Sequence, residues 1–110
     1  MKKQFLKLAN KILSEYDCTP TTYLSYTMKR QTEYGLLYIR IDEETMKGKL
    51  YSIYMIFASE GFKKEEFMRA FLTDAFNPHS YKWNIHTRDM QTALNQLENR
   101  LEGLTYPITN

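Results

Sequence analysis

Two stretches of alternating apolar and polar residues, joined by a short polar link, constrain the fold of this chain more than any other feature. Residues 34–42 place Leu37, Ile39 and Ile41 on one face of an extended strand, and residues 49–57 repeat the alternation. Period-two hydrophobicity is typical of strands that bury one face. The pair therefore predicts an antiparallel hairpin with one aliphatic face and one mixed, tyrosine-bearing face.

Apolar residues at helical spacing flank this hairpin on both sides. In the N-terminal segment, Phe5, Leu8 and Ile12 recur three or four residues apart, which is the spacing of one helix face. The same spacing returns after Thr87, a good N-cap, with Asp89 in the first turn. The predicted elements are a helix at 2–16, strands at 23–29, 34–42 and 49–57, a helix at 63–76, a strand at 82–86 and a final helix that Gly103 ends.

The element order α-β-β-β-α-β-α predicts a single α+β domain over residues 1–110, with residues 105–110 as a frayed tail. Short connections favour an antiparallel sheet of three or four strands. We expect the second and third helices to pack on its apolar face.

Composition excludes several classes of protein. Hydrophobic residues make up 43% and charged residues 25% of the chain, which is ordinary for a globular domain and too apolar for a disordered one. The longest uncharged apolar run is about half of the ~20 residues that a membrane helix needs, so we expect no membrane association. No apolar signal segment follows the basic N-terminus, and Cys18 is a single cysteine. These features predict a cytoplasmic protein.

Enzyme motifs are missing, which disfavours an enzyme without excluding one. The densest polar segment, residues 77–89, holds both histidines. One interpretation is a metal or acid–base site of His79, His86 and Asp89, with His86 as the general base. We favour a solvated loop and strand, because few ligands are offered and their spacing is not that of a metal site. We predict neither a metal nor a cofactor.

Basic residues are concentrated in the first part of the chain. Residues 1–40 carry seven basic and three acidic groups, whereas residues 41–110 carry eight and ten. A phosphate-contacting surface would consist of Lys3, Lys7 and Lys11, four residues apart on the first helix, joined by Lys29 and Arg30 at the tip of the first predicted hairpin. We favour the simpler interpretation, the solvated face of an amphipathic helix.

The order α-β-β-β-α of the first five elements is similar to that of the double-stranded RNA-binding domain. Lys63 and Lys64 open the second predicted helix, where that family carries lysines. The Gly-Pro and histidine of the family's first inter-strand loop have no match in Arg30, Gln31 and Thr32. The resemblance is one of topology, and RNA binding is what it implies.

Nine tyrosines give the chain a heavy aromatic load. Tyr23, Tyr38 and Tyr54 are predicted on the sheet face opposite the aliphatic one, where they would form a protein interface or a base-stacking platform unless a helix covers them. In the last helix, Leu97 and Leu101 belong to a leucine row that fits the core or a dimer seam.

The leading functional hypothesis is a small non-enzymatic protein that binds another protein or a second copy of itself. Its interface would use the three tyrosines or the two leucines. A nucleic-acid-binding domain with a basic first helix is the alternative, and a small enzyme centred on residues 79–89 is the second alternative.

Overall fold

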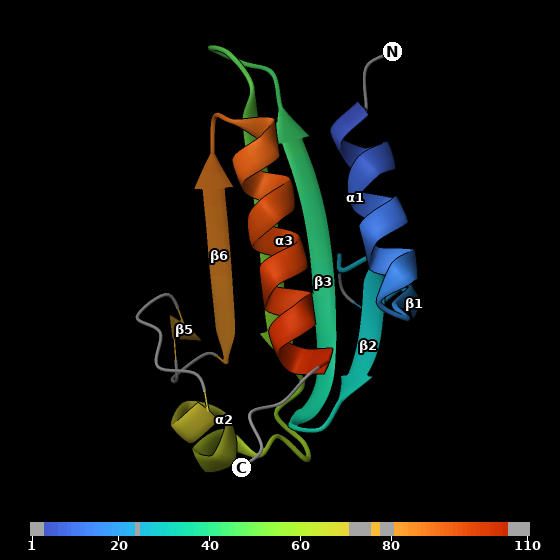
Figure 1. Cartoon of the computed structure of the whole chain (residues 1–110), viewed down its shortest axis with the longest axis vertical. Coiled ribbons are helices and arrows are strands. Elements are labelled where there is room, and N and C mark those ends of the chain that lie inside the picture. Colours follow the sequence, from blue (N-terminus) through green and yellow to red (C-terminus); the bar gives the residue numbers. More distant parts are fainter. Residues whose placement is uncertain (1–3, 24, 71–75, 78–80, 106–110) are drawn as a thin grey trace.

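The two alternating stretches form the longest strands of the protein, β3 (Gly35–Glu44) and β4 (Leu50–Phe57), which pair antiparallel. The computed structural model describes residues 4–23, 25–70, 76–77 and 81–105 of the chain (Figure 1). The other elements are α1 (Gln4–Glu15), β1 (Thr19–Pro20), β2 (Met28–Thr32), α2 (Lys64–Ala70), β5 (Phe76–Asn77), β6 (Lys82–Thr87) and α3 (Met90–Thr105).

The strands of these residues form one antiparallel sheet in the order β1-β2-β3-β4-β6-β5. Its four main strands confirm the predicted α+β domain, and the two-residue strands β1 and β5 extend the sheet at its edges. The first predicted strand was placed too early, because β2 begins at Met28 and not at Tyr23. Tyr23 does not belong to a strand, and its ring stacks on that of Tyr38, with ring centroids 4.3 Å apart.

Helices α1 and α3 lie side by side on one face of the sheet, where the aliphatic row of β3 is buried (Figure 1). Helix α1 begins at Gln4 in the described residues and inserts Phe5, Ala9 and Leu13 at four-residue spacing. The prediction that the second and third helices cover this face is therefore wrong for the second, whose place the first helix takes. None of the described helices is long and apolar enough to cross a membrane.

In the described residues, helix α2 covers Lys64–Ala70 of the predicted helix at 63–76 and lies at one end of the sheet (Figure 1). Phe76, which was predicted in this helix, belongs to β5 instead, where it pairs with Trp83. Residues 71–75 of the predicted helix lie outside the described residues. We expected the most buried helix here, but among residues 64–69 only Phe67 is fully buried. A helix that meets the end of a sheet covers less surface than one lying across it.

Asp89 is the N-cap of α3, a position that the sequence assigned to Thr87. Its Oδ2 accepts hydrogen bonds from the backbone N–H of Thr92, at 2.9 Å, and from the Thr92 hydroxyl, at 2.6 Å. The Thr87 hydroxyl instead accepts the backbone N–H of Asp89, at 3.2 Å. The bonds from Thr92 hold the pKa of Asp89 below its ordinary value.

We expect Asp89→Ala to lower the Tm at pH 7 by about 2–8 °C, because the substitution removes both bonds. A carboxyl whose pKa is lower in the folded state stabilises the fold above its unfolded pKa, and this contribution is lost as the pH falls through the folded value. The difference in Tm between parent and variant should therefore shrink below the ordinary carboxyl pKa of 3.8. Circular dichroism melts across this range measure it, with Asp89→Asn as the control that keeps the capping oxygen. An equal Tm for parent and Ala variant at pH 7 would contradict the cap.

Cys18 is buried directly after α1, with its backbone N–H bonded to the Leu13 carbonyl at 3.0 Å. Burial raises the pKa of its thiol from 9.0 to about 11. Because the thiolate is the reactive form, we expect a disulfide reagent at pH 8 to modify the native protein about 100-fold more slowly than the urea-unfolded chain. Absorbance of the released thiol measures both rates. Similar rates would show that Cys18 is accessible in the folded protein.

Candidate functional site

The sheet face opposite α1 and α3 is covered by no described helix, and we call it the open face. Side chains alternate between the two faces of a strand, so the strand register fixes which residues the open face carries. They are Lys29 and Gln31 of β2, Leu36, Tyr38, Arg40, Asp42 and Glu44 of β3, Leu50, Ser52, Tyr54 and Ile56 of β4, and Lys82, Asn84 and His86 of β6.

Two cross-strand rows at the centre of the open face are polar. One row runs Asp42–Ser52–His86 over β3, β4 and β6. The next row is formed by Arg40, Tyr54 and Asn84. Directly opposed side chains in a sheet interact, so each row joins groups from strands far apart in the sequence.

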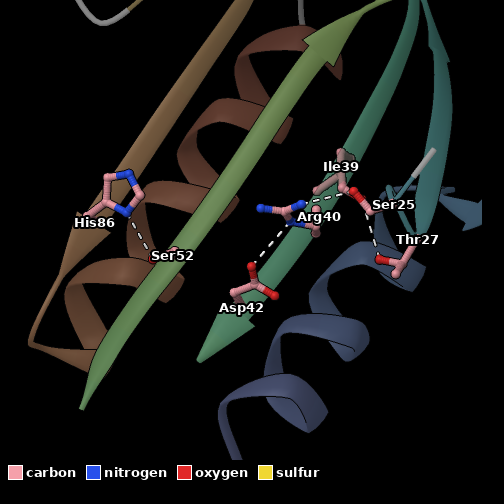
Figure 2. A network of polar contacts seen from close by, with 7 residues as sticks. All are labelled: Ser25, Thr27, Ile39, Arg40, Asp42, Ser52 and His86. Atoms are coloured by element: carbon pink, nitrogen blue, oxygen red, sulfur yellow. Dashed lines mark hydrogen bonds and ion pairs between the residues drawn. The ribbon is translucent and has the colours of Figure 1, made fainter. Parts of the chain in front are cut away.

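Arg40 is held by three contacts on this face. Its Nε lies 3.2 Å from Asp42 Oδ2, an ion pair without hydrogen-bond geometry, and a terminal nitrogen donates to Ser25 Oγ at 3.0 Å (Figure 2). Its guanidinium carbon lies 4.2 Å from the ring centroid of Tyr54, a cation–π distance. A partly exposed arginine fixed in this way loses little conformational freedom when a ligand binds to it.

His86 is positioned by Ser52, whose hydroxyl lies 2.9 Å from His86 Nδ1 (Figure 2). The imidazole also packs edge-on against Tyr54, with centroids 5.4 Å apart. Ser52 is only 3% exposed, so it is not placed to attack a substrate. The pair therefore orients an exposed histidine and leaves its Nε2 for contact with other groups.

The three predicted tyrosines gather on the open face, as the sequence indicated. Tyr23 is 47% exposed and covers one side of the Tyr38 ring, at an interplanar angle of 21°. Tyr26 also approaches Tyr38, with centroids 6.3 Å apart. One side of Tyr54 is taken by Arg40. Tyr23, Tyr26 and Tyr38 thus form one ring cluster, and Tyr38 and Tyr54 each have one side already occupied, by Tyr23 and by Arg40.

The structure describes two of the three residues of the acid–base or metal interpretation. His86 lies on the open face, Asp89 caps α3, and His79 lies outside the described residues. Among the residues that the structure describes, no group of three or more histidine, cysteine, aspartate or glutamate side chains is close enough to hold a metal ion.

The described members of the predicted basic surface lie on both sides of the sheet. Lys7 and Lys11 are exposed on α1, on the helical side of the sheet, and Lys3 lies outside the described residues. Lys29 stands on the open face opposite Tyr38. Arg30 points to the helical side, where it donates to the Leu101 carbonyl at 3.5 Å. Both lie within β2 and not at a hairpin tip, which corrects the predicted position of this pair.

Leu97 and Leu101 are fully buried beneath α3 in the core of the domain. The core interpretation therefore holds for them, and the interface prediction for these two leucines is wrong. They pack against the sheet of their own chain, which leaves no surface of theirs for a partner.

Sequence reasoning missed the Arg40 and His86 contacts that organise the open face. A scan against protein-family models finds no match, and no curated protein or solved structure is significantly similar to this chain.

Proposed function

We propose that this protein is a non-enzymatic binding domain that recognises another protein through the open face. The observation that supports this most is the layer of Arg40 over Tyr54, held in place on a sheet face that no described helix covers. Tyrosine and arginine are enriched in the cores of protein interfaces and among the residues that dominate binding energy. Side chains already fixed before binding lose less entropy when a partner arrives.

A protein partner fits this face better than a nucleic acid does. Base stacking needs free ring surfaces, and Tyr38 and Tyr54 each have one side covered by Tyr23 or Arg40. Phosphate recognition needs clustered cations, but Lys7 and Lys11 of α1 lie on the other side of the sheet from Lys29.

A cytosolic location belongs to the same proposal. The chain has one cysteine, and Cys18 is a free buried thiol. A protein built without disulfides suits a reducing compartment, where its partner would also be found.

Photo-crosslinking in cells that express the chain tests the binding role. A benzophenone amino acid is placed at Asn84 or Ile56 on the open face, and at Lys11 of α1 or Glu98 of α3 as matched controls. We expect discrete protein adducts from the two open-face positions and not from the two helix positions. Adding Arg40→Glu should reduce their yield by about fivefold or more, since arginine anchors dominate interfaces.

Two outcomes would contradict the proposal. Adducts that disappear after nuclease treatment would show that the open face binds nucleic acid. Adducts of equal yield from the helix positions would show that contact is not specific to this face. The Arg40→Glu variant must keep the parent Tm, so that loss of adducts reports on binding and not on folding.

A further inference from the structure

More than half of the outer edge of β6 is paired with no other strand among the residues that the structure describes. Strand β5 pairs with β6 only at Phe76–Trp83 and Asn77–Lys82. Beyond these pairs, the stretch from Asn84 to Thr87 has β4 on its inner side and no described strand on its outer side (Figure 1). An unpaired strand edge is a template for another strand.

The backbone groups that this edge offers follow from the register. In an antiparallel ladder, the N–H and C=O of one residue point to the same neighbour, and successive residues alternate. The Tyr81 carbonyl accepts the Phe57 N–H of β4 at 2.9 Å, so odd-numbered residues of β6 bond to β4. The N–H and C=O groups of Asn84 and His86 therefore point outward.

The described strand at the opposite edge of the sheet carries a protective proline, whereas the residues of this stretch of β6 include none. Strand β1 is two residues long and contains Pro20, which has no N–H to donate. Between Asn84 and Thr87, β6 has no proline, glycine or lysine. A natural edge without such protection is one that a partner strand can use.

The open-face side chains beside this edge are polar, and none of them is acidic. Successive open-face residues of β6 are Lys82, a cation, Asn84, whose amide donates hydrogen bonds, and His86, whose imidazole donates through Nε2 when the Ser52 hydroxyl donates to Nδ1. Asn84 and His86 are exposed, and Ser52 orients the His86 ring. Asp42, the acidic residue in the row of His86, lies two strands away and pairs with Arg40.

We propose that an extended acidic segment of a partner protein adds to the sheet as a strand along the outer edge of β6. Its backbone bonds to the N–H and C=O groups of Asn84 and His86, and its carboxylates lie beside Lys82 and His86. This proposal rests on the proposed function, because it names the class of partner that the open face recognises.

Selection of a random peptide library against the full chain tests this partner class. We expect selected peptides rich in aspartate, glutamate and β-branched residues, with binding measured by fluorescence anisotropy of labelled synthetic copies. Methylating alternate backbone nitrogens of such a peptide should weaken binding by about tenfold or more, because strand addition depends on main-chain hydrogen bonds.

Two matched lysines separate edge binding from general attraction. Lys82 and Lys29 belong to one row of the open face, on β6 and β2. We expect Lys82→Glu to weaken binding of the labelled peptide by about tenfold and Lys29→Glu by about twofold or less, since exposed charges at a distance are screened. Both variants should keep the parent Tm.

Strand addition at β6 is overturned if no peptide is selected, or if the selected peptides lack acidic residues. It is also overturned if backbone methylation leaves peptide binding unchanged, or if Lys82→Glu and Lys29→Glu weaken peptide binding equally. These failures are distinguishable from failure of the proposed function. If crosslinks from Asn84 and Ile56 to a protein persist, the open face binds its partner in another way. If those crosslinks are absent as well, both protein binding by the open face and strand addition at β6 are wrong.

Discussion

We expect Phe67→Ala to lower the free energy of unfolding by about 3–5 kcal/mol, a large part of the ~5–15 kcal/mol that holds a domain folded. Phe67 is 0% exposed. Its ring lies 5.2 Å from that of Phe57, 5.5 Å from Trp83 and 5.6 Å from Tyr34, measured between centroids. Truncation leaves a cavity among aromatic rings that cannot easily close. Urea unfolding followed by Trp83 fluorescence measures the loss.

Met68→Ala is the matched control, because Met68 is the next residue of α2 and only half-buried. We expect Met68→Ala to lower the free energy of unfolding by less than half as much as Phe67→Ala, since less apolar surface leaves the core. Equal losses would mean that α2 does not dock through Phe67 on the end of the sheet.

The central strands could be predicted from the sequence because their signal is local. Leu37, Ile39 and Ile41 alternate with polar or aromatic neighbours, and a short loop leads directly into the paired strand β4. Hydrophobic pattern and loop length then fix the register together.

The place of Phe76 could not be predicted because a nonlocal contact decides it. Residues 67–76 are apolar enough for one continuous helix. The structure instead places Phe76 in a strand pair with Trp83, whereas α2 covers Lys64–Ala70 among the described residues. A short apolar run fits a buried helix or a buried strand equally well, and only the partner distinguishes them.

The candidate site also has a part that local sequence patterns predict and a part that depends on nonlocal contacts. The tyrosines of the open face follow from alternation along single strands, so Tyr38 and Tyr54 could be assigned to one face. The contact of Ser52 with His86 depends on β4 and β6 being neighbours, although α2 lies between them in the sequence. The contact of Arg40 with Ser25 depends on the segment before β2 folding back onto the sheet.

Leu97→Ala should have an effect similar to that of Phe67→Ala, about 2–5 kcal/mol in the free energy of unfolding. Leu97 is 0% exposed and belongs to the core between α3 and the sheet. Because it packs within its own chain, the unfolding midpoint of the parent and of the variant should not change with protein concentration. A dimer seam along α3 would make both midpoints rise with concentration, since association stabilises the folded state by mass action.

Leu8→Ala is the control for this substitution, because Leu8 is 36% exposed on α1 and undergoes the same chemical change in a helix. We expect Leu8→Ala to lower the free energy of unfolding by less than about 1 kcal/mol, because it removes a smaller buried apolar area. Chemical denaturation over a hundredfold range of protein concentration tests both leucines. A small loss for Leu97→Ala, together with concentration-dependent midpoints, would return Leu97 and Leu101 to an interface. It would also shift the search for a partner from the open face to α3.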